Sequence, residues 1–169
     1  PAQRPRWVAA RDLLARSRSR RAQPARDDKV VACWNGLAIA ALAETGAVLD
    51  RPDLVRAAER IADLLVSVHL VVDRSPGPDA SVGTRTRLRR VSRDGRPGQA
   101  GGVLEDYGDM AEGLLALHAV TGEPAWLEIA GGLLDTVLTE FFTPVDPADP
   151  QRFSVHDTPS TAHDPSLTA

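Results

Sequence analysis

Two acidic clusters hold the residues of this sequence that are best suited to chemistry. Asp27 and Asp28 precede an apolar segment that begins near Trp34, and Glu105 and Asp106 precede a second such segment. Carboxylates crowded into a partly desolvated cavity repel one another, and this repulsion raises the pKa of at least one of them. A single residue type can then supply both a general acid and a general base. We therefore predict Asp28, Glu105 and Asp106 as candidate catalytic residues.

Aromatic and amide side chains accompany both acidic clusters. Trp34, Asn35 and Tyr107 offer aromatic faces and an amide beside the carboxylate of Asp27. This combination of groups is suited to holding a sugar ring or a similar polyol. We therefore assign Asp27, Trp34, Asn35 and Tyr107 to predicted substrate binding, with a small molecule, a sugar in particular, as the ligand. The alternative is that the acids only cap helices, because carboxylates satisfy free backbone N–H groups at helix N-termini.

Other kinds of site have little support in the sequence. The four histidines show no HxxxH or HExxH spacing, Cys33 has no CxxC partner, and no glycine loop suited to phosphate is present, so we predict no metal and no cofactor. A formal net charge of −3 gives no reason to expect nucleic acid. The apolar runs are too short to span a bilayer and no leader pattern opens the chain, so we expect no membrane association and a cytoplasmic location.

Helical periodicity dominates the chain. Apolar residues recur every three or four positions in five segments, which are residues 5–21, 34–45, 52–69, 105–121 and 124–142. The third and fifth segments align at an offset of 72 positions, and each follows a Thr-Gly pair whose glycine, Gly46 or Gly122, is predicted to end the preceding helix. Repeated helical hairpins predict a solenoid or a closed α/α toroid. Chance similarity between Ala- and Leu-rich helices is the alternative.

The predicted fold class is therefore all-α, with helical-hairpin repeats over residues 1–142. A Gly-, Pro-, Ser- and Arg-rich insertion, 71–102, separates the hairpins, and its alternating pattern and Asp94-Gly95 pair predict a short β-hairpin. Its arginines form a basic patch that suits a ligand phosphate or carboxylate, or that is simply a solvated face. Residues 143–169 are Pro-rich without periodicity and are predicted to be an irregular tail, truncated from a longer protein.

The hairpin repeat also predicts where the acids meet. Equivalent helices of successive hairpins run in the same direction, so the N-terminal ends of the helices over 34–45 and 105–121 are expected at one rim. The four carboxylates Asp27, Asp28, Glu105 and Asp106 would then converge there.

Two separate strings of the sequence resemble the spermatogenesis-associated protein 20 family, whose bacterial members are called YyaL-like. The matching motifs follow the family's order over residues 5–142: Pro24, Asp27-Asp28-Lys29, Trp34-Asn35-Gly36, Arg93-Asp94-Gly95-Arg96, Leu104-Glu105-Asp106-Tyr107 and Thr121-Gly122. The resemblance implies a thioredoxin-like domain elsewhere in the polypeptide and an (α/α)6 toroid similar to N-acylglucosamine 2-epimerases and six-hairpin glycosidases, of which this chain is a fragment. A Pro-rich stretch with Phe153 replaces the family's Gly-Gly-Phe-Phe segment, so the pocket wall there is expected to differ.

Two functions follow from these observations. The first is a carbohydrate-active epimerase, isomerase or hydrolase in which two of Asp28, Glu105 and Asp106 transfer protons. The alternative is a non-catalytic binding or scaffold domain that serves the thioredoxin-like domain, with the acids acting as helix caps.

Overall fold

The computed structural model describes residues 3–73, 85–146 and 149–159, and most of these residues are helical. The helices are α1 (Gln3–Ser19), α2 (Ala32–Val48), α3 (Pro52–Val68), α4 (Leu104–Thr121) and α5 (Pro124–Glu140). Each lies within three residues of a predicted segment at both ends, so the mainly helical prediction is confirmed. None of these described helices is long and apolar enough to cross a lipid bilayer.

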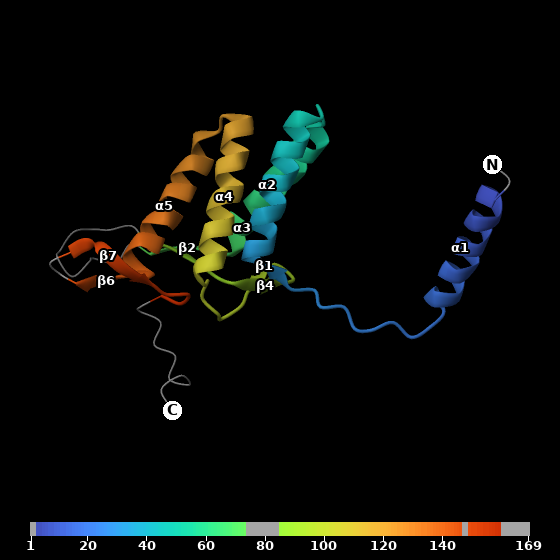
Figure 1. Ribbon diagram of the computed structural model, residues 1–169, viewed down its shortest axis with the longest axis horizontal. Coiled ribbons are helices and arrows are strands. Elements are labelled where there is room, and N and C mark those ends of the chain that lie inside the picture. The colour runs from blue at the N-terminus through green and yellow to red at the C-terminus, as the bar shows by residue number, and fades with distance from the viewer. Residues whose placement is uncertain (1–2, 74–84, 147–148, 160–169) are drawn as a thin grey trace.

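Helix α1 lies apart from the other four helices, at the end of an extended segment (Figure 1). Its apolar residues, Trp7, Leu13 and Leu14, are all more than 60% exposed. These apolar side chains therefore remain largely exposed among the described residues, and Trp7 is contacted by Arg11 of the same helix, 5.3 Å from its ring centroid.

The remaining helices form two antiparallel hairpins, α2–α3 and α4–α5, whose first helices lie side by side and run in the same direction (Figure 1). The predicted common direction of the inner helices is thus confirmed. The core between the hairpins is apolar, and its largest fully buried side chains include Ile39, Leu65, Met110, Leu114 and Phe141. Burial of these side chains is the main favourable term in holding the hairpins together.

Helices α2 and α4 approach each other closely through two glycines. A Cβ atom added at Gly36 would overlap the Asp109 carbonyl and lie 2.7 Å from the Met110 nitrogen. A Cβ added at Gly113 would overlap the Gly36 carbonyl in turn. The backbones touch because neither position carries a side chain, and this contact fixes the axial register of the two helices.

The two Thr-Gly pairs behave differently. Gly122 ends α4 as predicted, with a left-handed φ of 72° and its N–H donating to the His118 carbonyl. The prediction for Gly46 was wrong, because α2 continues to Val48 and Gly46 is buried inside it. A Cβ at Gly46 would lie 2.7 Å from Cγ2 of Val55, so this glycine permits close packing of α3 instead of ending a helix.

Short antiparallel sheets cover the end of the hairpins where α2 and α4 begin. The strands β1 (Val30–Val31), β4 (Val91–Arg93) and β5 (Arg96–Pro97) form one sheet, and β2 (Leu70–Asp73) pairs with β3 (Arg85–Leu88) in another. Asp94 and Gly95 form the β4–β5 turn with φ angles of 51° and 71°. The predicted β-hairpin in the insertion is therefore confirmed, and β1 ties it to the start of α2.

The prediction of an irregular tail was wrong for the residues up to Val155. Strands β6 (Phe142–Asp146) and β7 (Asp149–Val155) pair in an antiparallel hairpin, and the rings of Phe142 and Phe153 lie 4.8 Å apart. The prolines in this segment conceal the alternating pattern, and an edge strand tolerates them because it needs few ladder donors. Residues 160–169 of the predicted tail lie outside the described residues.

The contact between α2 and α4 can be tested by adding one methyl group. We expect Gly36→Ala to lower the free energy of unfolding by about 1 to 3 kcal/mol, because the methyl group overpacks a backbone contact. The matched control is Gly108→Ala on α4, where nothing lies within 4 Å of the added Cβ. This control should raise the free energy of unfolding by up to about 1 kcal/mol through helix propensity. Urea denaturation measures both changes, and equal behaviour of the two variants would contradict the close contact.

Candidate functional site

Asp106 is fully buried and joins the N-termini of two helices. Its Oδ1 accepts a hydrogen bond from the Cys33 backbone nitrogen in the first turn of α2, at 3.2 Å. Its Oδ2 accepts from the Val103 nitrogen at the N-cap of α4, at 3.0 Å, and from Nη1 of Arg90, at 3.2 Å. One carboxylate therefore satisfies free N–H groups of α2 and α4 together, which is the capping role weighed against catalysis.

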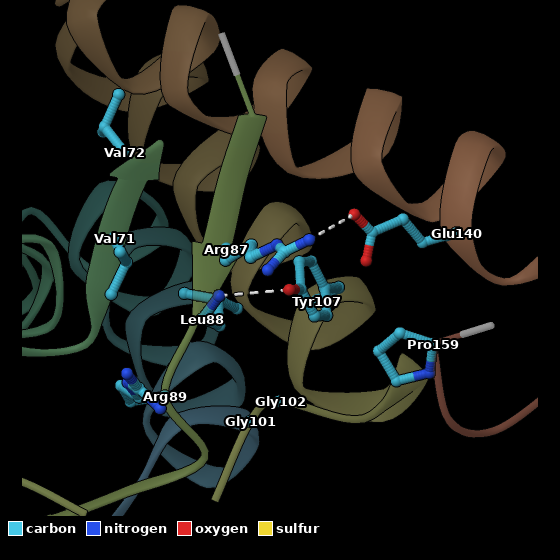
Figure 2. Close-up of a pocket in the computed structure, with 10 residues that line it drawn as sticks. All are labelled: Val71, Val72, Arg87, Leu88, Arg89, Gly101, Gly102, Tyr107, Glu140 and Pro159. Carbon is cyan, nitrogen blue, oxygen red and sulfur yellow. Dashed lines mark hydrogen bonds and ion pairs between the residues drawn. The ribbon is translucent and has the colours of Figure 1, made fainter. Parts of the chain in front are cut away.

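Tyr107 is a core residue whose hydroxyl group reaches the insertion. Its ring is 2% exposed and packs edge-on against Phe141, with the ring centroids 5.2 Å apart. The hydroxyl oxygen accepts a hydrogen bond from the Leu88 nitrogen of β3 at 3.1 Å (Figure 2). The ring face is thus not available for stacking on a sugar, although Tyr107 is among the residues that line a pocket.

Asp27 and Asp28 lie in the exposed segment before β1. Asp27 pairs with Lys29 at 3.2 Å, and Asp28 pairs with Arg26 at 2.8 Å. The contact with Lys29 lowers the pKa of Asp27. Both residues thus pair with basic residues of their own segment, and the structure does not show the predicted meeting of four carboxylates.

Trp34 and Asn35 lie in the first turn of α2. Trp34 is 68% exposed, so its ring is available to a ligand or to another part of the protein. Asn35 is half-buried, and its Nδ2 donates to the Val31 carbonyl at 2.8 Å. This amide therefore supports the junction between β1 and α2.

Glu105 lies close to Asp109, a carboxylate that was not predicted from the sequence. Side-chain oxygens of Glu105 and Asp109 and the sulfur of Cys33 all lie within 4.8 Å of one another. Glu105 is exposed and pairs loosely with Arg90 at 3.8 Å, whereas Asp109 is half-buried. Asp109 could have been predicted from its spacing, because it lies four residues after Glu105 and residues four apart on a helix share a face.

Burial and neighbouring charges raise the pKa of two groups in this cluster, the Asp109 carboxyl group and the Cys33 thiol. Desolvation raises the pKa of Asp109, and the charges of Glu105, Glu112 and Asp106 add to the effect. Burial, with the nearby Asp106 carboxylate, raises the pKa of the Cys33 thiol to about 11. The thiol is therefore neutral at neutral pH and is a poor nucleophile or metal ligand. The cluster thus combines an exposed carboxylate, a half-buried carboxyl group of raised pKa and a neutral thiol.

The structure thus defines a pair of packed helical hairpins with an acidic face on α4 and a shared cap behind it. No protein-family model matches the chain. Among proteins of known name, the chain is 36% identical to human spermatogenesis-associated protein 20 (Homo sapiens) over 132 residues, which are 74% of the chain and 15% of the relative. It is 34% identical to the mouse protein of that name (Mus musculus) over 137 residues, 79% of the chain and 16% of the relative.

The chain therefore belongs to the spermatogenesis-associated protein 20 family, which confirms the resemblance seen in its motifs. It spans about 15% of the length of these relatives, so it corresponds to one portion of a larger protein.

The shared cap predicts a large loss of stability when Asp106 is removed. We expect Asp106→Ala to lower the free energy of unfolding by about 3 kcal/mol, because the change leaves two buried backbone N–H groups without an acceptor and leaves Arg90 only its longer contact with Glu105. Asp28→Ala is the control, since it removes an exposed carboxylate and should change stability little. Denaturant unfolding of both variants tests the role, and a small effect at Asp106 would argue against it.

The raised pKa of Asp109 makes stability depend on pH in a defined direction. The folded state binds the proton more tightly than the unfolded state, so stability falls as the pH rises from the ordinary value of 3.8 through the raised one. Asp109→Asn removes this penalty and should be more stable than the parent protein at pH 7, with the gain disappearing in acid. Melting temperatures measured across this pH range, with Asp135→Asn as the control for a lost surface carboxylate, test the sign. A variant that is less stable at pH 7 would contradict it.

Proposed function

We propose that this chain is part of a six-hairpin α/α toroid and contributes an acidic face on which Glu105 and Asp109 transfer protons to a bound carbohydrate. The observation that carries the proposal is the close pair of carboxylates, within 4.8 Å, in which burial raises the pKa of Asp109. A carboxyl group with a raised pKa beside an exposed carboxylate is suited to act as a general acid and a general base. Epimerases, isomerases and glycosidases all use such groups.

The neighbouring residues support a sugar as the ligand. Trp34 offers an exposed indole ring on the adjacent helix, and aromatic faces pack against the C–H surface of sugar rings. The proposal retains Glu105 from the residues predicted by sequence and replaces Asp28 and Asp106 with Asp109. The replacement follows from the contacts described above, because Asp106 caps two helices and Asp28 pairs with Arg26.

Exposed apolar side chains support the continuation of the hairpin array on both sides. Leu127, Leu134 and Leu138 form a stripe along one face of α5 and are 40 to 62% exposed. Leu37 and Val48 are exposed on α2. In hairpin repeats, such faces are covered by the next hairpins of the array. The remaining length of the protein would supply these hairpins, together with the thioredoxin-like domain that the family resemblance implies.

The alternative function is a non-catalytic binding or scaffold domain for that thioredoxin-like domain. One observation favours it: two of the predicted site residues, Asp106 and Tyr107, make their contacts inside the fold. In that case the acidic face has no proton to transfer, and the residues of α4 serve only the packing of the hairpins.

Titration of the intact protein with sugars separates the two functions. We expect heat of binding for at least one member of a panel of neutral aldoses, ketoses and N-acetylhexosamines, with turnover followed by NMR. Asp109→Asn and Glu105→Gln should each reduce turnover by about a hundredfold or more, because each removes a proton-transfer group. Glu128→Gln, at an exposed site on α5, is the matched control and should keep full turnover.

Two outcomes would decide against proton transfer at this face. The first is the absence of both binding and turnover across the panel for the correctly folded protein. The second is turnover that persists unchanged in Asp109→Asn and Glu105→Gln. Either result would favour the scaffold function.

A further inference from the structure

A second polar site lies on the other side of α4 from the acidic pair. It is a pocket of about 340 Å³ between the β2–β3 hairpin and the ends of α4 and α5 (Figure 2). Successive helix residues are rotated by about 100°, so Tyr107, which lines this pocket, projects well away from Glu105 and Asp109. The pocket therefore has its own lining and its own chemistry: the residues that matter below are Arg87, Arg89, Tyr107, Glu140 and the backbone at Gly101 and Gly102.

Positive charge prevails among the described residues of the pocket. Arg87 and Arg89 line it together with a single carboxylate, Glu140. Arg85, at the other end of the same strand, lies 3.7 Å from that carboxylate and adds a third guanidinium nearby. The Glu140 side chain is 5% exposed, and its negative charge is paired with the guanidinium groups of Arg85 and Arg87.

Among the described residues, few groups accept hydrogen bonds from Arg87. Its Nη2 contacts Oε1 of Glu140 at 3.3 Å, and its Nε is buried without a hydrogen-bond partner among the described residues. The side chain is nevertheless 40% exposed, so the rest of the guanidinium remains accessible from the pocket. A guanidinium has five N–H donors in a planar fork that matches a carboxylate or a phosphate.

Two further donors belong to residues that line the pocket, Arg89 and Tyr107. Arg89 donates one bond, from Nη1 to the Gln99 carbonyl at 2.9 Å, which positions its guanidinium beside the pocket. The hydroxyl oxygen of Tyr107 accepts from Leu88, which leaves the hydroxyl hydrogen for a ligand. Burial raises the pKa of Tyr107, so the hydroxyl keeps this hydrogen at neutral pH.

Gly102 lets the side chains of Tyr107 and Leu88 lie close to the backbone just before α4. A Cβ added at Gly102 would lie 3.1 Å from Cε2 of Tyr107 and 3.0 Å from Cβ of Leu88. The backbone there donates from Gly102 to the Leu88 carbonyl at 2.7 Å, which closes the strand against the start of α4. The phenol ring can therefore lie against the backbone with its hydroxyl group directed at β3.

We propose that this pocket binds a small organic anion, a carboxylate or a phosphate ester, whose anionic group pairs with Arg87 and Arg89 and whose hydroxyl group lies near Glu140 and Tyr107. Arginine guanidinium groups bind both anions through the same geometry, and a neighbouring carboxylate accepts hydrogen bonds from a ligand hydroxyl. The site is independent of the proton transfer proposed for Glu105 and Asp109.

Calorimetric titration of the intact protein tests this site with three probes. Inorganic phosphate and glucuronate carry the two kinds of anionic group, and glucose is the uncharged control. We expect heat of binding for one or both anions, and this heat should depend on Arg87. Glucose is an aldose of the panel above, so any heat that it produces is assigned to the acidic face and should be unchanged in Arg87→Gln. Binding of phosphate alone identifies a phosphate ester as the ligand class, binding of glucuronate alone identifies a carboxylate, and binding of both supports the shared chemistry.

Matched variants separate a built pocket from a diffuse basic surface. Arg87→Gln should weaken anion binding by about tenfold or more, because it removes the charge-assisted contacts. Arg96→Gln removes an exposed arginine from the same insertion, outside the pocket, and should leave binding unchanged. If Arg87→Gln fails to fold, as judged by its melting curve, Arg89→Gln replaces it with the same expectation.

Three results would overturn the proposal. They are the absence of binding of both anions, equal weakening by the pocket variant and by Arg96→Gln, and binding that neither Arg87→Gln nor Arg89→Gln reduces. Asp109→Asn should leave phosphate binding unchanged. This variant therefore distinguishes a failure at the pocket from a failure of the proton-transfer proposal.

Discussion

The contact between the backbones of α2 and α4 is the constraint on which the rest of the structure depends. Gly36 and Gly113 allow the two helices to touch, and the touching backbones determine how far one helix slides along the other. In the observed register both N-termini lie at the same level, so the carboxylate of Asp106 on α4 reaches the Cys33 amide on α2. The same register places Cys33 beside Glu105 and Asp109. The close backbone contact at Gly36 and Gly113 thus determines how Asp106, Cys33, Glu105 and Asp109 lie relative to one another at the start of the two helices.

Local signals in the sequence predicted most of the helical structure. Hydrophobic periodicity and the cap at Gly122 depend on residues a few positions apart, and these features agree with the structure. The failures concern long-range packing. Gly46 has the sequence context of a helix end, but the approach of Val55 from α3 gives it a different role. The pairing of β6 with β7 was missed because prolines interrupt the alternation on which strand prediction rests.

The candidate site shows the same division between composition and geometry. The sequence drew attention to Glu105, Asp106 and Tyr107 as one acidic and aromatic cluster, but consecutive helix positions point in different directions. Glu105 faces outward, Asp106 faces α2, and Tyr107 faces β3 and Phe141. Asp109 has no motif around it and becomes prominent only when its burial and its neighbours are known. The acidic and aromatic character of this cluster was therefore predictable from the sequence. The role of each residue depends on which neighbouring element it faces from α4.

The carboxylate shared between α2 and α4 also affects what counts as the repeating unit of this fold. A hairpin array is usually described as copies of one hairpin, each able to be added or lost by duplication or deletion. Here the amide at the start of α2 relies on an acid that comes 73 residues later in the chain. A copy of the first hairpin alone would carry an uncapped helix, and deletion of the second would uncap the first. The smallest unit in which both inner helices are capped is therefore the pair of hairpins.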